Sequence, residues 1–373
     1  MECPHFSAAR CLSCTLMGVP YAEQVAAKEQ AVRALLPAGI DWLPSVVGPE
    51  SGFRNKAKMV VTGTVAAPVL GILDRSGGGI DLQDCGLYPP ELSDAFAPLS
   101  RFITLARLTP YDVAQRRGEL KYLLITVAPD GGLMVRFVVR STESLSRIRK
   151  HLPTLLGWLP QARVVSVNLQ PEHKAVLEGE REELLLGESL TMRVNDLDLH
   201  LRPQSFFQTN TEVAAALYRQ VQEWVAEGVP REVWDLYCGV GGFALHCAAA
   251  GRRLVGVEVS AEAVASAQRS ATALPGDVEF IVADATRWAV ARTDAPDLVV
   301  VNPPRRGIGP DLADWLERST TPTVVYSSCN ASTLARDLAA MPSLQPVRAR
   351  VLDMFPQTDH YEVAVLLERT VRS

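Results

Sequence analysis

One short stretch in the second half of the chain constrains the fold more than any other feature. Residues 233–237 form a mostly apolar run, and a cluster of glycines follows it, starting at Gly239. Glycine allows a sharp turn and a close approach of the backbone to a ligand. A second apolar run, 254–258, ends in Glu258, 19 residues after Gly239. A glycine turn followed by an acid at this distance is typical of a nucleoside site, in which the carboxylate binds the ribose hydroxyls.

The rest of this half alternates between strand and helix patterns. The expected parallel strands are 233–237, 254–258, 278–282, 297–301 and 323–327. Such alternation predicts a doubly wound, Rossmann-like sheet, which binds its ligands at the carboxyl ends of the strands. Polar residues occupy each of these ends: Tyr237, Glu258, Asp284, Asn302 and Cys329. The sequence therefore predicts an α/β domain with one binding cleft, and an antiparallel hairpin near 346–352 and 361–367 that closes the sheet.

The first half of the chain is richer in strands. A hairpin is expected at 120–127 and 133–139, and helices are expected at 21–36 and 143–156. Further expected strands are 59–65, 69–73, 164–169 and 197–202. We therefore expect three parts: an N-terminal cysteine segment over 1–44, a strand-rich α+β domain over 45–202 and a catalytic α/β domain over 203–373.

Composition favours a soluble globular protein. Of 373 residues, 47% are hydrophobic and 21% are charged, and no apolar run approaches the roughly 20 residues of a transmembrane helix. The N-terminus has neither the basic start nor the apolar middle of a signal peptide. We expect a cytoplasmic protein that acts as a monomer and has no membrane partner.

The net charge of −5 is unevenly distributed along the chain. Residues 101–150 contain ten Lys and Arg and four Asp and Glu, a local charge of +6 (10 − 4). Arg54, Lys56 and Lys58 also alternate, which on a strand would place them on one face. An acidic protein can bind RNA phosphates through one basic face, although a solvated strand face would show the same alternation.

Four cysteines gather in the first half of the sequence. Cys3, Cys11 and Cys14 lie within the first 14 residues, and Cys85 is the other cysteine of this half. A short loop can present several thiolates to one metal, and four cysteines suit either an iron–sulfur cluster or structural zinc. The spacing favours neither metal, and four free thiols would leave the same pattern.

A polar and aromatic loop, 202–210, precedes a helix expected at 211–226. A flipped pyrimidine needs a ring to stack on and an amide to read its edge, and Phe206 and Gln208 would supply these groups. An ordinary loop with one buried Phe would account for the same residues.

Cys329 ends the fifth expected strand, inside the predicted cleft. A buried cysteine is usually a small hydrophobic residue, but this position also suits a nucleophile. Uracil C5 is too weakly nucleophilic to be methylated unaided, whereas a thiolate that adds to C6 turns C5 into an enolate carbon. A base must then remove the C5 proton, and Glu362 is a candidate, although a surface carboxylate would give the same pattern. Cys238, in the glycine turn, is a competing nucleophile.

The Asn302-Pro-Pro sequence after the fourth strand leaves an alternative open. Proline fixes a stiff loop, which would hold the Asn302 amide at the floor of the cofactor site. Amino-group methyltransferases have a similar loop with an aromatic residue in place of Arg305, so methylation of adenine or guanine amines is a second hypothesis. A third is an RNA-binding protein that senses redox state or iron through its cysteines.

These motifs together resemble the RNA uracil-C5 methyltransferases over nearly the whole chain. The motifs are Phe206-Phe-Gln-Thr-Asn210, Asn302-Pro-Pro-Arg-Arg-Gly307, Ser327-Ser-Cys-Asn330 and His360-Tyr-Glu362, and the glycine turn resembles the first motif of S-adenosylmethionine (SAM) methyltransferases. The resemblance implies methylation of one uridine of 23S ribosomal RNA, with Cys329 as nucleophile and Glu362 as base. Some family members have Asp where this chain has Asn302.

The resemblance also assigns ligands. It implies that Gln208, Tyr237, Glu258 and Asn302 bind SAM, whereas the loop pattern alone assigns Gln208 to the base. Gly239 and Asp284 are expected in the same cofactor site because of their places at strand ends. The four cysteines, Cys3, Cys11, Cys14 and Cys85, resemble the ligands of the family's 4Fe–4S cluster, which this likeness favours over zinc.

Overall fold

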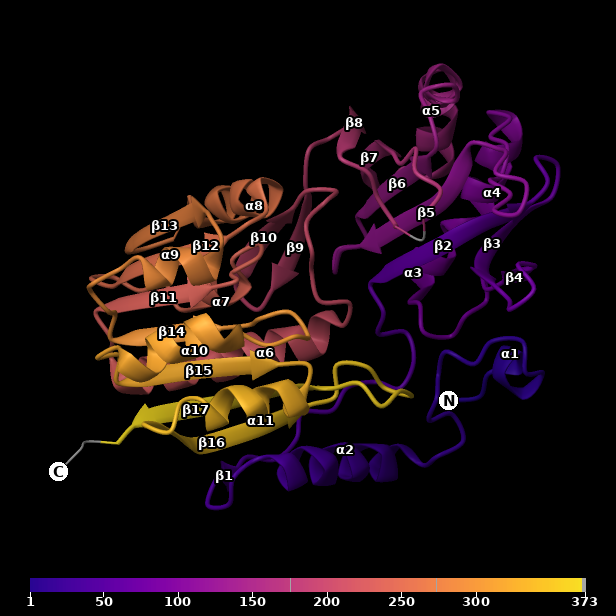
Figure 1. Cartoon of the computed structure of the whole chain (residues 1–373). Coiled ribbons are helices and arrows are strands. Elements are labelled where there is room, and N and C mark those ends of the chain that lie inside the picture. The colour runs from indigo at the N-terminus through magenta and orange to yellow at the C-terminus, as the bar shows by residue number, and fades with distance from the viewer. Residues whose placement is uncertain (175, 273, 371–373) are drawn as a thin grey trace. The chain divides into compact units, whose positions relative to one another are not determined.

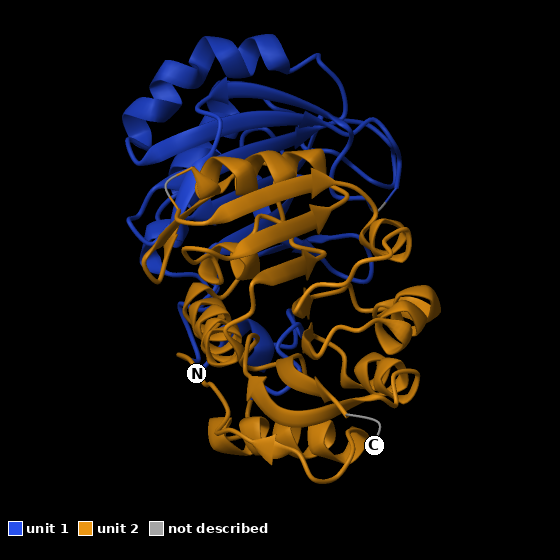
Figure 2. Cartoon of the chain, turned by 90° about the vertical axis from the view of Figure 1, so that its left-hand side faces the viewer, with its two compact units in different colours: residues 1–17, 50–192 blue, residues 18–49, 193–373 orange. Residues whose placement is uncertain are grey.

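The computed structural model describes residues 1–174, 176–272 and 274–370, and the chain forms two compact units (Figure 2). Unit 1 comprises Met1–Met17 and Glu50–Met192, and unit 2 comprises Gly18–Pro49 and Arg193–Ser373. The three parts expected from the sequence divide the chain differently, because residues 18–49 belong to unit 2. Each unit has its own sheet and its own apolar core.

Unit 2 is a doubly wound α/β structure, as the alternating pattern predicts. Its main sheet has the strand order β1-β16-β17-β15-β14-β11-β12-β13. The strands are β1 (Asp41–Trp42), β11 (Glu232–Leu236), β12 (Arg253–Glu258), β13 (Asp277–Val282), β14 (Leu298–Val301), β15 (Thr323–Ser328), β16 (Leu344–Leu352) and β17 (Glu362–Arg369). Strands β11 to β15 pair in parallel, and β17 pairs antiparallel with β15 and β16. The predicted parallel strands and the closing hairpin are therefore confirmed.

Helices pack against this sheet (Figure 1). They are α2 (Tyr21–Leu35), α6 (Thr211–Gly228), α7 (Gly242–His246), α8 (Ala261–Ala271), α9 (Ala285–Val290), α10 (Gly309–Arg318) and α11 (Ala331–Ala339). The ring of Trp234 in β11 stacks on Trp315 of α10 at 5.7 Å between centroids and meets the edge of Trp288 of α9 at 4.6 Å. Aromatic burial of this kind fixes the strands beneath the helices, and with them the strand ends.

Polar side chains at the carboxyl ends of the strands begin the following helices. Ser260 accepts from the Ala263 amide at 3.3 Å, Asp284 from the Arg287 amide at 2.9 Å, and Asn330 from the Ser332 amide at 3.1 Å. These contacts satisfy amides that the first turn of a helix leaves without partners. A polar residue at a strand end therefore has a structural use, which applies to Asp284 in particular.

Unit 1 is built on a second sheet, with the strand order β4-β3-β2-β5-β6-β7-β8. The strands are β2 (Lys56–Gly63), β3 (Pro68–Leu73), β4 (Gly79–Asp81), β5 (Leu120–Val127), β6 (Leu133–Val139), β7 (Ala162–Leu169) and β8 (Arg181–Leu186), and the helices are α1 (Pro4–Ser7), α3 (Pro90–Ser93), α4 (Phe96–Leu105) and α5 (Leu145–Trp158). Residues of α4 and α5, including Leu99, Phe102 and Ile148, are buried against one face of the sheet.

The remaining elements connect these parts of the chain. β9 (Leu190–Val194) pairs with β10 (Leu197–Leu201) in a two-stranded sheet. The predicted hairpin of β5 and β6 and the helices α2, α5 and α6 are present, whereas β1, β4, β8, β9, α1, α3 and α4 were not expected from the sequence. No helix among the described residues has the length and apolar character that a membrane crossing requires.

Candidate active site

A cavity of about 670 Å³ opens at the carboxyl ends of the parallel strands of unit 2. The loops after β11, β12, β13, β14 and β15 all contribute to its lining, together with the loop before α6. Every cleft residue that the sequence singles out lines it: Phe206, Gln208, Tyr237, Gly239, Glu258, Asp284, Asn302, Cys329 and Glu362. The structure thus brings together residues that lie up to 156 positions apart in the chain (362 − 206).

The glycine turn after β11 forms one wall of this cavity. Tyr237 and Gly239 both have left-handed backbones, with φ of 66° and 55°, and the amides of Tyr237 and Cys238 both donate to the Val257 carbonyl at 3.0 and 3.1 Å. A Cβ on Gly239 would meet nothing within 4 Å, so its backbone faces open space. At Gly242, a Cβ would lie 2.5 Å from the ring of Tyr218. The two glycines therefore have different functions: Gly239 leaves room for a ligand, and Gly242 allows close packing against Tyr218.

Glu258 is held rigidly opposite this turn. One carboxylate oxygen accepts from the Gly239 amide at 3.1 Å, and the other accepts from the Ser260 amide at 2.9 Å. A carboxylate fixed by two backbone amides keeps lone pairs available for hydroxyl groups in the cavity. This geometry suits the binding of a ribose.

Asp235 lies beneath the turn and not in the cavity. It is fully buried, and its carboxylate accepts from the Ala244 amide at 2.9 Å, which ties α7 to β11. Burial raises the pKa of Asp235 to about 8. The role of Asp235 is therefore to hold the turn in place.

Two further strand ends complete the cofactor side of the cavity. The hydroxyl groups of Tyr237 and Thr286 lie 2.9 Å apart, and Asp284 caps α9 with one carboxylate oxygen. The backbone N–H of Asn302 donates to the Leu236 carbonyl at 3.5 Å, which aligns the start of the Asn302-Pro-Pro loop with β11.

Glu362 lies at the start of β17, next to the end of β15. The two strands are antiparallel, and Ser328 pairs with Val363, so Cys329 and Glu362 follow at the same end of this pair. Ser327 donates its hydroxyl to a Glu362 oxygen at 2.6 Å. Glu362 is only 3% exposed, and burial raises its pKa to about 7. A carboxyl group with a pKa near neutrality is suited to accept a proton.

Cys329 is partly exposed at the cavity wall. Burial and the nearby Glu362 raise the pKa of its thiol, whereas the charge of Arg305 and a hydrogen bond with it act in the opposite direction. Cys238, the competing nucleophile, is almost fully buried, and burial raises its pKa well above the ordinary value. The comparison favours Cys329 as the thiol that can react as a thiolate.

Arg305 is the principal site residue that the sequence patterns did not identify. Its side chain lies 3.1 and 3.3 Å from the two ring nitrogens of His360. Its carbonyl accepts from Asn330 at 3.3 Å and from the Thr333 hydroxyl at 3.1 Å. These bonds tie the Asn302-Pro-Pro loop to the start of α11, beside Cys329. The sequence alone could have singled out Arg305 only if Cys329 were already known to be the nucleophile and a positive charge were sought near it.

The loop between β16 and β17 also reaches the cavity, and helix α2 holds it. Phe355 of this loop lines the cavity. Lys28 of α2 is buried and donates to Asp353 at 2.6 Å and to the Phe355 carbonyl at 3.2 Å. Gln24 exchanges two hydrogen bonds with Gln357, each 3.0 Å long. Residues from the first part of the chain therefore position a loop of the site.

The four cysteines predicted to bind metal lie in unit 1. Burial and then the neighbouring Cys85, Cys11 and Cys3 raise the pKa of Cys14 to about 11, so the four thiols are close enough to interact. None of them forms a disulfide bond. Among the residues that the structure describes, no group of three or more His, Cys, Asp or Glu side chains has an arrangement that could hold a metal ion. Metal binding here stays a prediction.

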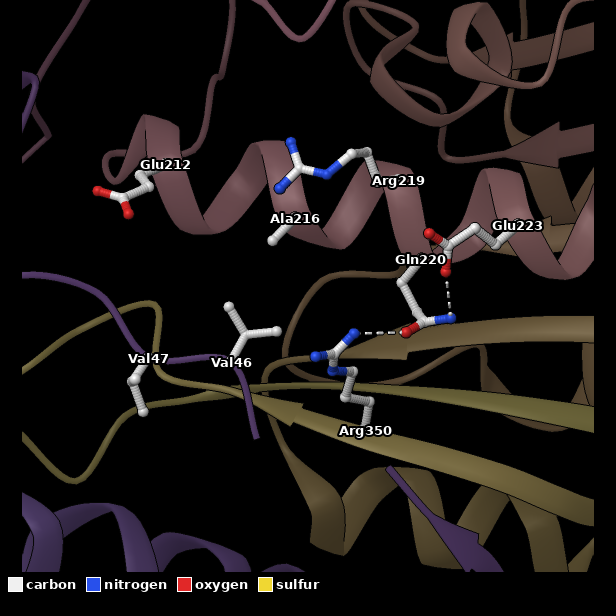
Figure 3. A pocket seen from close by; sticks show the side chains of 8 residues that line it. All are labelled: Val46, Val47, Glu212, Ala216, Arg219, Gln220, Glu223 and Arg350. Atoms are coloured by element: carbon white, nitrogen blue, oxygen red, sulfur yellow. Dashed lines mark hydrogen bonds between the residues drawn. The ribbon is translucent and has the colours of Figure 1, made fainter. Parts of the chain in front are cut away.

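A separate cavity of about 330 Å³ lies in unit 2, between α6 and β16 (Figure 3). Three of its polar side chains form a chain of hydrogen bonds: Arg350 donates to Gln220 at 2.8 Å, and Gln220 donates to Glu223 at 3.3 Å. None of the residues predicted to be functional lines this cavity. We therefore assign it no function.

Comparison with known proteins identifies relatives of nearly the same length. The chain is 48% identical to the 23S rRNA (uracil(747)-C(5))-methyltransferase RlmC of Pectobacterium atrosepticum, over 99% of this chain and 100% of that protein. It is 49% identical to RlmC of Yersinia pseudotuberculosis, over 98% of this chain and 99% of that protein. The relatives therefore cover both units and the cavity.

Family models and a solved structure agree with these relatives. Residues 291–370 match the tRNA (Uracil-5-)-methyltransferase model, and residues 233–321 match a methyltransferase domain model. The structure of the Pyrococcus abyssi tRNA (uracil-54, C5)-methyltransferase in complex with S-adenosyl-L-homocysteine superimposes with a TM-score of 0.80. It is 26% identical and covers 95% of this chain, which covers 86% of that one. The chain belongs to the RNA uracil-C5 methyltransferase family, in its RlmC branch.

Proposed function

We propose that this protein methylates C5 of uridine 747 in 23S ribosomal RNA, with SAM as the methyl donor. The substrate is that named for relatives 48–49% identical over almost the whole chain. The observation that carries the chemistry is the lining of one cavity by Cys329 and Glu362 together with the glycine turn and Glu258. A ribosomal substrate implies that the protein works in the cytoplasm, and we propose that it acts as a monomer.

The proposed mechanism gives Cys329 and Glu362 separate roles. The Cys329 thiolate uses its electron pair to form a bond to uracil C6, and the displaced π pair of the C5–C6 double bond makes C5 an enolate carbon. C5 then takes the methyl group from the sulfonium of SAM, which leaves as S-adenosyl-L-homocysteine. The Glu362 carboxylate accepts the C5 proton, and the bond between C6 and sulfur breaks to release the thiolate. The complete cycle returns Cys329 to the thiolate, and Glu362 returns to the carboxylate once its proton passes to solvent.

Other residues of the cavity are proposed to hold the reactants. Glu258 would bind the ribose of SAM, and Gly239, Tyr237, Asp284 and Asn302 would contact the rest of the donor. Phe206, which is 70% exposed and lines the cavity, would stack on the target base. Gln208 is almost fully buried at the same wall, where it could contact either SAM or the base.

A trapped intermediate tests this assignment. In RNA with 5-fluorouridine at the target position, the fluorine on C5 cannot leave as a proton does, so the adduct with Cys329 should persist. We expect wild-type protein and SAM to give a covalent complex on a denaturing gel, and C329A to give none while still binding SAM. C238A is the matched control and should form the adduct. If C329A retained full activity, the mechanism would be wrong.

The amino-group alternative predicts a different product. It needs neither Cys329 nor Glu362, and it would place the methyl group on an adenine or guanine nitrogen. Mass spectrometry of nucleosides from treated 23S RNA should show 5-methyluridine and no methylated purine.

We also propose that Cys3, Cys11, Cys14 and Cys85 hold a 4Fe–4S cluster. Cysteine thiolates are the donors that such a cluster takes, and these four thiols form no disulfide and lie close enough to influence one another; zinc is the alternative. Methyl transfer needs no electrons, so the cluster would be structural or would contact RNA. The visible spectrum of protein purified without oxygen distinguishes the two metals, because zinc sites have no absorption there.

A further inference from the structure

The excess of positive charge in residues 101–150 is organised around one loop of unit 1. This loop joins α4 to β5, and hydrogen bonds from Arg140, just after β6, and from Arg147, in the first turn of α5, connect its two ends to these elements. Its three arginines are Arg107, Arg116 and Arg117, and all three side chains are exposed. Within the described residues, none of these three side chains has an ion pair or a hydrogen bond.

Two neighbouring arginines, Arg140 and Arg147, hold the two ends of this loop by hydrogen bonds. Arg140 donates to the buried carboxylate of Glu119 at 3.0 and 3.2 Å and to the Arg116 carbonyl at 3.4 Å. Ser141 adds two bonds to Glu119, from its amide at 3.1 Å and from its hydroxyl at 2.7 Å. The charge of Arg140 is therefore neutralised, and its remaining donor holds the backbone at Arg116.

The other end of the loop is held in the same way. Arg147 pairs with Glu143 and donates to the Ala106 carbonyl at 2.9 Å and to the Arg107 carbonyl at 3.3 Å. The two supported positions, Arg107 and Arg116, are left-handed, with φ of 51° and 54°. Such a conformation costs a residue with a Cβ about 1–3 kcal/mol and persists only where the surroundings determine it, which is common at binding sites.

The loop therefore has two classes of arginine with different functions. Arg140 and Arg147 form ion pairs with carboxylates, and their remaining N–H groups donate to backbone carbonyls of the loop. Arg107, Arg116 and Arg117 keep their charge and face solvent from a rigid support. Of the two acids of the loop, Glu119 pairs with Arg140, and Asp112 uses a carboxylate oxygen to accept from the Gln115 amide at 2.8 Å. A guanidinium group that is free, on a backbone held by other contacts, is suited to bind phosphate with two parallel hydrogen bonds.

We propose that Arg107, Arg116 and Arg117 form a docking surface for the phosphate backbone of the RNA substrate. The inference rests on the proposed function, since it takes ribosomal RNA as the partner. A net charge of −5 would repel RNA over most of the surface, so a local group of free arginines would orient the encounter. Phosphate contacts position an RNA without reading its sequence, which is left to the cavity in unit 2.

The test measures RNA binding as a function of salt. The variant R107Q/R116Q/R117Q keeps a Cβ at each position and removes three charges. Each contacted phosphate contributes about 0.7 to 0.9 to the slope of log K against log salt concentration. We therefore expect the slope to fall by about 2 to 3, with weaker binding at low salt. SAM affinity, melting temperature and kcat at saturating RNA should stay as in the wild type.

A matched control distinguishes this surface from general charge. Arg75, in the turn between β3 and β4 of the same unit, is also exposed and has no ion pair among the described residues. R75Q should leave the slope unchanged, whereas R116Q alone should lower it by about 0.7 to 0.9. An unchanged slope in the triple variant, at a normal melting temperature, overturns the docking surface alone. A wild-type protein that makes no 5-methyluridine would instead overturn the proposed function.

Discussion

At the scale of single residues, burial decides which groups can act. Glu362 and Asp235 are both buried carboxylates whose pKa values burial raises, to about 7 and about 8. Only Glu362 lines the cavity, and Ser327 donates to it from the strand that carries Cys329. The same physical cause thus gives a structural acid beneath the turn and a proton acceptor beside the proposed nucleophile.

The raised pKa of Glu362 predicts the pH dependence of the reaction. The base must be ionised to take the C5 proton, so the rate should show a rise with pH centred near 7 that belongs to Glu362, and ionisation of the Cys329 thiol, whose pKa burial also raises, should add a second rise at higher pH. E362Q should lose at least about 100-fold in kcat, the usual contribution of a general base. E362Q should accumulate the covalent adduct with unmodified RNA. The adduct still forms through Cys329, but without the base the C5 proton is not removed and the adduct does not break down. Single-turnover rates between pH 5.5 and 9 provide the measurement, and an unchanged profile in E362Q would contradict the assignment.

The same pKa has an opposite effect on stability. A buried carboxyl group with a raised folded-state pKa is stabilising when protonated, and that contribution is lost as pH rises from about 4.5 through about 7. E362Q removes the titration, so its free energy of unfolding should fall less steeply than that of the wild type over this window. Urea denaturation at several pH values measures the difference. Asp235 remains in both proteins, so its own titration cancels in the comparison.

At the scale of elements, the two glycines of the turn after β11 have separable functions. A methyl group on Gly242 would collide with Tyr218, which is buried against Phe243, so G242A should destabilise the protein by about 1–3 kcal/mol. A methyl group on Gly239 would meet open cavity and obstruct SAM, and the left-handed backbone there, with φ of 55°, would add a strain of about 1–2 kcal/mol. Both variants should therefore lose some stability, but only G239A should lose SAM binding, whereas folded G242A should still bind SAM. Calorimetric titration and thermal unfolding of both variants compare them, and equal effects would contradict this division.

A second element-scale prediction concerns the hold of α2 on the loop between β16 and β17. Lys28 and Asp353 form an ion pair whose side chains are only 3% and 1% exposed. Removing one partner of a buried pair leaves an uncompensated charge and typically costs about 3–5 kcal/mol. K28M should show this loss in urea denaturation, together with a lower kcat, because Phe355 would no longer be held. The double variant K28M/D353N removes both charges and should recover much of the stability.

The outcome of that comparison also separates charge from packing. If K28M/D353N were as unstable as K28M, the contact of Lys28 with the Phe355 carbonyl would be the more important one, contrary to the prediction.

At the scale of the whole molecule, local patterns account for the framework and long-range contacts account for the rest. The alternation of strands and helices placed Tyr237, Glu258, Asn302 and Cys329 at one edge of a sheet, and the structure brings them to one cavity. Strand ends alone could not show that Asp284 also caps α9. Lys28 and Asp353 lie 325 residues apart, and nothing in either local sequence connects them. The free and neutralised arginines of unit 1 likewise differ only in their partners, not in their sequence pattern.

The division into two units predicts that the cysteines and the cofactor cavity respond independently. The four cysteines lie in unit 1, whereas the residues that line the cavity lie in unit 2, which has a separate core. On the proposal that these cysteines hold a 4Fe–4S cluster, C11S should lower the iron content and the melting temperature of unit 1, and should leave the dissociation constant of SAM within about twofold of the wild type. A metal that binds its ligands only in the folded state adds its binding free energy to the stability of the unit that contains them. Iron analysis, differential scanning calorimetry and SAM titration of the same anaerobic preparation measure the three quantities.

C247S, which alters a buried cysteine of unit 2, is the control and should leave the iron content unchanged. Loss of SAM binding in C11S would show that the two units are energetically coupled, contrary to this prediction.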